Sequence, residues 1–263
     1  MLFRLMLAAA AVYLLAALAL VLLQRRILFR PDPVAPDIAA LGVPGATEIH
    51  VAGILGWYRP AAPGQPTLLY FHGNAGSLTD RIPRFRRYAQ TGWGLLFMEY
   101  PGYGGQPGSP SEAAFARNAQ AAADALAAKD VLPAQLVLYG ESLGTGVATR
   151  LAESRPAAAL ILESPYTSIR AIGEARYPWL PVGLLARDPF EIEPRLGQVH
   201  VPVLILQGGM DDIVPPEMGL RDFKAANEPK QLWSVPEAGH ENLMQFGAAD
   251  VVTAFVTAHL SGG

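Results

Sequence analysis

Short, uninterrupted apolar runs recur along the chain, separated by longer amphipathic or alanine-rich stretches. Strands that are apolar on both faces belong to a parallel sheet covered by helices. Helices are predicted between and after the runs, and this alternation indicates an α/β domain with a mainly parallel sheet and helices on both faces. The apolar runs are residues 67–71, 94–100, 136–139, 159–162 and 202–206, and the predicted helices cover about 109–129, 143–153, 215–226 and 246–260.

Two local signals refine this pattern. Residues 47–51 and 54–58 flank a short turn, which predicts an antiparallel hairpin at one edge of the sheet. Before the alanine-rich stretch, Ser109 is the expected N-cap, Pro110 the first helical residue and Glu112 the third. Together they predict a capping box that begins the helix.

The chain begins with a long apolar segment. Residues 5–23 carry no charge, and about 19 helical residues at 1.5 Å each approach the roughly 30 Å of bilayer hydrocarbon. We therefore predict a single-pass membrane anchor within residues 1–30 that contacts the lipid bilayer through residues 5–23. A signal peptide cleaved after Ala17-Leu18-Ala19 is the alternative, but the apolar run continues beyond that site.

The residues around the anchor bear on orientation and domain boundaries. Arg4 precedes the apolar run and three arginines follow it by residue 30. The arginine count favours a cytoplasmic catalytic domain, although the side of the membrane stays open. The proline-rich residues 31–36 predict a linker, so the catalytic domain is expected to span residues 37–263.

Composition narrows the chemistry. The 20 basic and 23 acidic residues give a net charge of −3, and no basic cluster is interleaved with aromatic residues, so nucleic acid is excluded as the expected partner. The chain has no cysteine, which removes thiolate nucleophiles and thiolate metal sites. The remaining candidate nucleophiles are oxygen atoms.

Polar residues follow three of the apolar runs and a further strand-like segment that ends at Val235-Pro236. In open parallel sheets, ligands bind beyond the carboxyl ends of the strands. Those ends carry a turn rich in backbone donors, a serine between two glycines, a pair of aspartates and a histidine: residues 72–76, Ser142, Asp211 with Asp212, and His240. The sequence therefore predicts a catalytic site at this edge.

Ser142 is the candidate nucleophile. It lies in the pattern G-x-S-x-G between a predicted strand and a predicted helix, where a sharp turn exposes the serine and bulk at Gly140 or Gly144 would collide with neighbouring elements. The helix that begins at Leu143 adds partial positive charge for developing negative charge. An ordinary strand-to-helix turn is the alternative for this pattern.

A serine hydroxyl needs a base, and the base needs an orienting acid. His240 is the expected base, and His72 is expected to shape its own loop. Asp211, Asp212 and Glu163 are candidates for the acid; we favour Asp211, with Asp212 as a capping or surface residue. The chain order of serine, aspartate and histidine is the order expected of α/β-hydrolases.

Two backbone amides are expected to form an oxyanion hole. One belongs to Leu143, directly after the nucleophile, and the other to Asn74 in the turn at residues 72–76, with Ala75 as the second choice. A tight turn without any catalytic role is the alternative for this loop.

Seven ordered motifs run along nearly the whole chain: LFRPDP after the anchor, HGNAGS, EYPGYGGQPGSPSE, GESLGTGVA, ESPYTS, GGMDDIVP and GHENL. In these motifs the chain resembles the membrane-anchored α/β-hydrolase-domain serine hydrolases. The resemblance implies an α/β-hydrolase fold and assigns Ser142, Asp211 and His240 as the triad, because the family's acid lies three residues before a Val-Pro pair, here Val214-Pro215.

Two features depart from the family pattern. Gln207 stands where the family often has histidine, a difference expected to affect packing and not chemistry. The segment at about 166–199 is short for a cap, and its apolar residues either form a rim over the site facing the membrane or cover the sheet. These residues are Tyr177, Trp179, Leu180, Leu184 and Leu185.

These observations predict a membrane-anchored serine hydrolase that cleaves acyl esters or thioesters of a hydrophobic substrate through an acyl-enzyme. No cofactor or metal is expected, and no protein partner can be inferred. An aminopeptidase-like or other amide hydrolase is the alternative within the enzyme class, since one triad serves both bonds. A non-catalytic binding module on the same fold is the alternative outside it.

Overall fold

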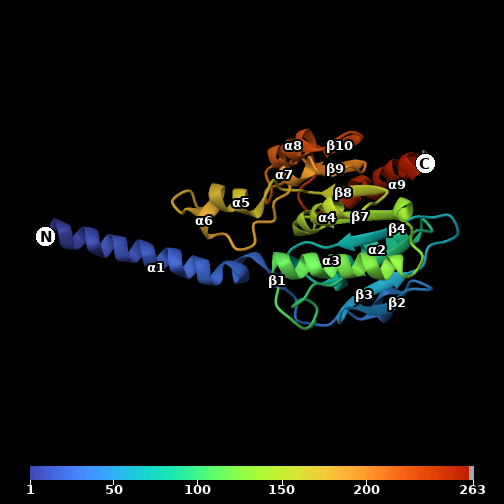
Figure 1. The fold of residues 1–263 in the computed structure, drawn as a ribbon, viewed down its shortest axis with the longest axis horizontal. Helices are drawn as coiled ribbons and strands as arrows, with labels where there is room; N and C mark the ends of the chain where they lie inside the picture. Colours follow the sequence, from blue (N-terminus) through green and yellow to red (C-terminus); the bar gives the residue numbers. More distant parts are fainter. Residues whose placement is uncertain (261–263) are drawn as a thin grey trace.

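A computed structural model describes residues 1–260, in which a long N-terminal helix leads into an eight-stranded sheet (Figure 1). The strand order is β10-β9-β8-β7-β4-β6-β3-β2, and neighbours are parallel except for the pairs β2–β3 and β3–β6. The α/β prediction and the antiparallel edge hairpin are confirmed. The strands are β2 (Thr47–Val51), β3 (Ile54–Arg59), β4 (Thr67–Phe71), β6 (Gly94–Met98), β7 (Leu136–Glu141), β8 (Ala159–Glu163), β9 (Val203–Gly208) and β10 (Lys230–Val235).

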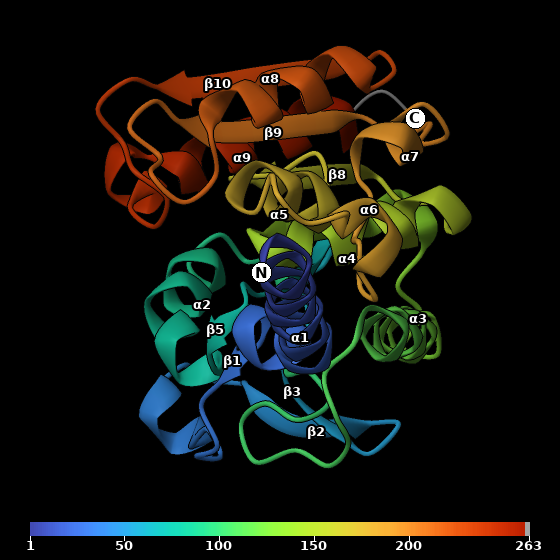
Figure 2. The same ribbon diagram turned by 90° about the vertical axis from the view of Figure 1, so that its left-hand side faces the viewer.

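Helices cover both faces of the sheet, giving three layers (Figure 2). Alternate strand residues divide between two apolar cores: Leu69 and Phe71 pack on the side of α3, α4 and α8, whereas Leu68 and Tyr70 pack on the side of α2 and α9. This alternation explains why the central strands are apolar throughout. The helices are α2 (Ile82–Ala89), α3 (Glu112–Ala127), α4 (Leu143–Ser154), α8 (Pro216–Ala225) and α9 (Ala248–Leu260).

The start of α3 differs from the prediction. Ser111, not Ser109, is the N-cap, and its Oγ accepts a hydrogen bond from the Ala114 amide at 3.2 Å. The Glu112 amide donates to Oδ1 of Asp188 at 2.9 Å. The capping box from Ser109 was therefore wrong, because a distant carboxylate binds the first amide of the helix.

The structure differs from the predicted helices at two other places. The apolar pattern did not reveal α2, whose eight residues include three arginines. The last helix begins at Ala248, not near residue 246, because Gly247 has φ +95° and interrupts the helical backbone. The remaining short helical turns are η1 (Ile38–Leu41), η2 (Leu78–Arg81), η3 (Pro133–Gln135) and η4 (Leu243–Phe246).

The N-terminal helix α1 (Leu2–Leu28) is long and apolar enough to cross a membrane, by length and composition. The chain that leaves it is fixed to the domain. Phe29 is buried, with its ring centroid 5.3 Å from that of Phe115, and β1 (Arg30–Pro31) pairs in parallel with β5 (Ala75–Gly76). The end of α1 thus lies beside the loop that follows β4 (Figure 1).

The cap segment at about 166–199 forms three short helices, of which α5 and α6 lie near α1 and α7 lies beside α8 (Figures 1 and 2). They are α5 (Ile169–Arg176), α6 (Val182–Leu185) and α7 (Glu193–Leu196). No residue of α5 or α6 is buried. The two ends of the segment belong to the apolar core on the side of α3 and α4, through Tyr166, Phe190, Ile192, Leu196 and Val199. Only its middle part, α5 and α6, is peripheral.

Candidate active site

Ser142 lies at a sharp turn between β7 and α4. Its backbone has φ +49° and ψ −118°, a conformation that L-residues rarely adopt and that persists only where surrounding contacts enforce it. Those contacts are backbone hydrogen bonds: the Ser142 amide donates to the Glu163 carbonyl at 2.8 Å, and the Ser142 carbonyl accepts from the Thr145 amide at 2.9 Å. The turn is therefore fixed from both sides.

The glycines that flank Ser142 are required by space. A Cβ at Gly140 would lie 2.4 Å from the Gly144 carbonyl oxygen, and a Cβ at Gly144 would lie 2.1 Å from the Phe71 carbonyl oxygen. Both distances are far below van der Waals contact, and the atoms that would have to move belong to the backbone. The collision expected from the sequence is present at both positions.

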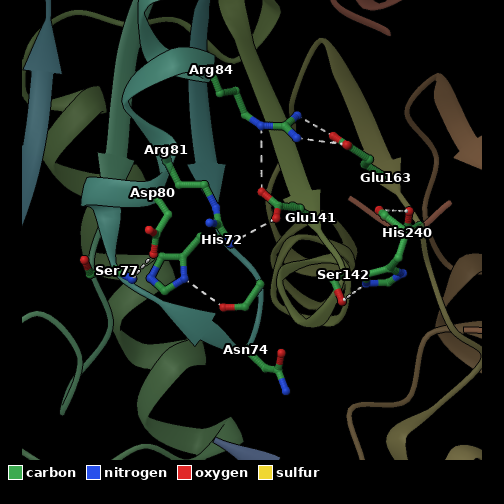
Figure 3. A network of polar contacts seen from close by, with 12 residues as sticks. His72, Asn74, Ser77, Asp80, Arg81, Arg84, Glu141, Ser142, Glu163 and His240 are labelled. Atoms are coloured by element: carbon green, nitrogen blue, oxygen red, sulfur yellow. Dashed lines mark hydrogen bonds and ion pairs between the residues drawn. The ribbon is translucent and has the colours of Figure 1, made fainter. Parts of the chain in front are cut away.

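Three strand ends bring the predicted nucleophile, base and acid together. His240 Nε2 lies 2.8 Å from Ser142 Oγ, and His240 Nδ1 lies 2.7 Å from Asp211 Oδ2. With its proton on Nδ1, the imidazole donates to Asp211 and accepts from Ser142. Figure 3 shows Ser142 at the start of α4 with His240 facing it. This geometry can remove a proton from the serine hydroxyl.

Asp211 is held in place by its own loop. It is 6% exposed, and its Oδ1 accepts hydrogen bonds from the amides of Ile213 at 3.0 Å and Val214 at 2.8 Å. Asp212 is exposed, as expected for the surface alternative. Gln207 Nε2 lies 3.4 Å from Asp211 Oδ2, so Gln207 contacts the acid and does more than fill space.

The negative charge of Asp211 raises the pKa of the His240 imidazole. Burial disfavours the charged form of His240, but the hydrogen bond to Asp211 and its negative charge outweigh burial, with smaller contributions from Glu141 and Glu241. The pKa of His240 is therefore raised above its ordinary value of 6.5. The backbone of His240 is also fixed, because Ser164 Oγ donates to its carbonyl at 3.1 Å.

Two unpaired amides lie near the serine. Within residues 1–260, the backbone amides of Leu143 and Asn74 donate to no protein acceptor. A Cβ on Gly73 would lie 3.5 Å from Ser142 Cβ, so this loop lies against the serine. Ala75 is part of β5 and pairs with Arg30. The amides of Leu143 and Asn74 are thus the free donors expected of an oxyanion hole.

Asn74 also has a structural contact that the sequence did not predict. Its side chain points away from Ser142 (Figure 3), and its Nδ2 donates to the Leu28 carbonyl at 2.9 Å. Asn74 therefore joins the loop at the site to the end of α1.

The chain is similar to several known proteins over most of its length. No protein-family model matches the chain. The uncharacterized protein Rv2307c of Mycobacterium tuberculosis is 39% identical over 227 residues, covering 83% of this chain and 81% of that protein. The lysophosphatidylserine lipase ABHD12 of Danio rerio is 32% identical over 197 residues, covering 67% of this chain and 51% of that protein.

Solved structures show the same fold. The esterase Pf2001 of Pyrococcus furiosus superposes with a TM-score of 0.69 at 19% identity, covering 89% of this chain and 98% of that structure. The chain belongs to the α/β-hydrolase-domain serine hydrolases. The resemblance recognised in its sequence motifs is confirmed.

Behind the serine of this hydrolase lies a buried charge network that sequence reasoning missed (Figure 3). Glu163 forms a two-pronged ion pair with Arg84 of α2 and accepts a hydrogen bond from Tyr139. The carboxylate of Glu163 is therefore used in these contacts, and His240 pairs with Asp211 instead. The alternative prediction of Glu163 as the triad acid was wrong. Glu141, directly before Ser142, lies 3.0 Å from Arg81 and 3.7 Å from Arg84.

The arginines keep Glu141 ionised. Burial disfavours its carboxylate, but the positive charges of Arg81 and Arg84 and a hydrogen bond from Tyr70 outweigh burial and lower the pKa of Glu141 to about 2. The sequence did carry a signal for this network, because Glu141 and Glu163 end two apolar strands. A buried carboxylate needs a cation beside it. The hydrophobic pattern did not predict α2, and so the arginines that pair with these carboxylates, Arg81 and Arg84, could not be identified from it.

The loop after β4 is shaped by His72, as its sequence position indicated. The side chain is fully buried, its Nδ1 lies 2.8 Å from the Gly73 carbonyl oxygen, and its Nε2 lies 3.3 Å from Glu99 Oε2. The Tyr100 hydroxyl donates to the His72 carbonyl at 2.9 Å. These contacts hold the loop in a single conformation beside Ser142.

Residues 1–260 contain no cluster of three His, Asp or Glu side chains that could hold a metal ion. An oxygen nucleophile with an imidazole base is chemically sufficient for acyl transfer without one.

Proposed function

We propose that this chain is a membrane-anchored serine hydrolase that cleaves acyl esters or thioesters of lipid-like substrates, with Ser142, His240 and Asp211 as its catalytic triad. The observation that carries the proposal is the continuous hydrogen-bonded series of Ser142 Oγ, His240 Nε2, His240 Nδ1 and Asp211 Oδ2, with distances of 2.8 and 2.7 Å. Such a series turns a weak hydroxyl nucleophile into a strong one.

The reaction has two halves. Ser142 Oγ attacks the substrate carbonyl carbon while His240 Nε2 takes its proton, and the amides of Leu143 and Asn74 stabilise the oxyanion. His240 then protonates the leaving alcohol or thiol, and the acyl group stays on Ser142. Water attacks this acyl-enzyme with His240 as base, which releases the carboxylic acid and restores the serine.

The lipid-like substrate is supported by the position of the site. The loop of Asn74 is hydrogen-bonded to Leu28 at the end of α1, and β5 of the same loop pairs with β1. If α1 crosses the bilayer, the site lies at the membrane surface, and the arginines after α1 favour the cytoplasmic side. The relative ABHD12 is named a lysophosphatidylserine lipase, which agrees with an acyl ester held in a membrane.

A fluorophosphonate probe tests the nucleophile. The wild-type protein and Ser154→Ala, an exposed serine in the same helix, are expected to label, whereas Ser142→Ala is not. Labelling of Ser142→Ala, or no labelling of the wild type, would contradict the proposal.

Acyl esters of increasing chain length test the substrate class. We expect kcat/KM to rise with chain length, because each buried methylene adds about 0.8 kcal/mol of transfer free energy. A sharp preference for acetyl esters would rule out a lipid-like substrate while leaving the hydrolase intact.

A further inference from the structure

The cap segment and α1 run side by side and are joined by specific contacts (Figures 1 and 2). The Tyr13 hydroxyl donates to the Trp179 carbonyl at 3.1 Å, and their ring centroids are 6.2 Å apart. Gln24 donates to the Leu185 carbonyl at 3.2 Å and accepts from the Arg187 amide at 2.8 Å. The cap therefore accompanies α1 from Gln24 to Tyr13.

The length of α1 between these two contact points is comparable to half the thickness of a membrane. Eleven residues separate Tyr13 from Gln24, which is about 16 Å along a helix at 1.5 Å per residue. Half of the bilayer hydrocarbon is about 15 Å thick. If the uncharged residues 5–23 cross the bilayer, Trp179 is attached to a part of α1 that lies inside it. The tip of the cap cannot then remain in water.

The side chains at the tip suit that environment. Leu184 is 87% exposed, more than any other large apolar side chain within residues 29–260, and Trp179 is 51% exposed. Leu184 is almost uncovered, and about half of the Trp179 surface stays free of protein contacts. In water they would present apolar surface next to the apolar face of α1, an arrangement that marks an interaction site.

Charged residues surround the opposite end of the cap. Arg25 at the end of α1 forms a two-pronged ion pair with Asp188, with distances of 2.7 and 3.1 Å. Arg170 pairs with Glu191 at 3.1 Å. Arg187 follows and is exposed. Arginine at this level suits the headgroup region, where its long side chain reaches polar groups.

Two charges limit the depth. Glu174 and Arg176 in α5 are exposed, and an unpaired charge within the hydrocarbon is costly. The tip is therefore expected to enter one leaflet only, with both charged side chains extended toward the headgroups.

We propose that the tip of the cap, residues 177–185, inserts into the lipid bilayer beside α1 and is covered there by acyl chains. The inference rests on the proposed membrane anchor and assigns the tip of the cap to the first of the two alternatives, a membrane-facing rim. The cap also begins at the site, since the Tyr166 hydroxyl donates to the Leu143 carbonyl at 3.1 Å.

Tryptophan quenching tests the insertion without requiring activity. The full-length chain is reconstituted in phosphatidylcholine vesicles with and without lipids brominated in the upper acyl chain. Trp57 and Trp93 are buried, and Trp233 is removed by Trp233→Phe in all samples. We expect bromine to quench the remaining fluorescence, and the quenched component to disappear in Trp179→Phe. Equal quenching with and without Trp179 would overturn the proposal and leave the tip in water or against protein.

A pair of leucine variants tests the role of the rim in catalysis. Leu184→Asp is expected to lower the ratio of the rate on a vesicle-embedded long-chain ester to the rate on a soluble short-chain ester by about tenfold or more. Leu132→Asp, an exposed leucine in the loop before η3, is expected to leave the ratio unchanged. An unchanged ratio in Leu184→Asp would contradict the rim. No hydrolysis of either ester by the wild type would refute the proposed function, while the quenching result would still decide the insertion.

Discussion

The Ser142 turn and the cap lie at the same edge of the sheet but are built in opposite ways. The turn has no free space, because a Cβ at Gly144 would lie 2.1 Å from backbone, and the charges of Arg84 and Glu163 are buried behind it. The cap has no buried residue in α5 or α6 and is tied to α1 by few polar contacts. Dense packing fixes the reacting groups, whereas the cap is left to meet the substrate and its surroundings.

This difference in packing predicts which substitutions should impair the protein most. Reacting atoms need positions fixed to within a fraction of an ångström, so substitutions around Ser142 should be severe. Exposed segments open at low free-energy cost, so substitutions in the cap should leave the fold intact.

Asp211→Asn should have the largest effect. We expect kcat to fall by about 10³- to 10⁴-fold, because the asparagine no longer stabilises the imidazolium and favours the wrong tautomer. In the wild type, the rate should fall as the pH drops through the raised pKa of His240. In the variant that pKa drops, because burial remains and the negative charge is gone, so the acid limb of the pH–rate profile moves to lower pH.

The neighbouring Asp212→Asn is the matched control, since Asp212 is exposed. We expect its kcat and pH–rate profile to stay close to wild type. A severe loss in Asp212→Asn with a mild one in Asp211→Asn would reverse the assignment of the acid.

Gly144→Ala tests the difference in packing between the Ser142 turn and the cap segment. The added methyl must displace the backbone at Phe71, so the free energy of unfolding should fall by about 3 kcal/mol or more. Gly197→Ala after α7 is the comparison, because a Cβ there meets nothing within 4 Å and should change stability by less than about 0.5 kcal/mol. Urea unfolding in detergent measures both. Equal losses would show that the turn is no more constrained than the cap region.

Glu141→Gln tests the buried charges. Removing the carboxylate leaves Arg81 and Arg84 less compensated, and the free energy of unfolding at pH 7 should fall by about 2–3 kcal/mol. The pKa of Glu141 is lowered from 4.5 to about 2, so its stabilisation is present above pH 4.5 and is lost as the pH falls toward 2.

The gap in stability between wild type and Glu141→Gln should therefore close on acidification. Exposed Glu217→Gln on α8 is the control and should show no such pH-dependent gap. A gap that is constant between pH 7 and pH 2 would mean that Glu141 does not stabilise the protein as a carboxylate.

Arg25→Ala should have the smallest effect. Asp188 is buried, but Arg25 is 44% exposed, and such pairs are weakened by solvent. We expect a loss of about 1 kcal/mol in the free energy of unfolding and a rate on a soluble short-chain ester within about twofold of wild type. A large loss of that rate would show that the reacting groups depend on the cap more than its few contacts imply.

Much of this fold was predictable because its signals are local. The apolar runs at 67–71 and 159–162 became β4 and the greater part of β8, since a strand buried on both faces must be apolar throughout. The turn at Ser142 was predictable for a similar reason, because only glycine fits at Gly140 and Gly144. The rest depends on distant partners, as with Asp188 at the start of α3.

The sequence by itself determined the apolar strands, the helices α3, α4, α8 and α9, the apolar length of α1 and the residue types at the four strand ends. Periodicity, side-chain volume and donor chemistry are properties of each segment. Only the tertiary structure decided that Glu163 pairs with Arg84, that Asn74 binds the end of α1 and that the cap lies along α1. These contacts join residues at least 46 positions apart. No local pattern encodes such contacts, since they form only when the sheet and its helices pack together.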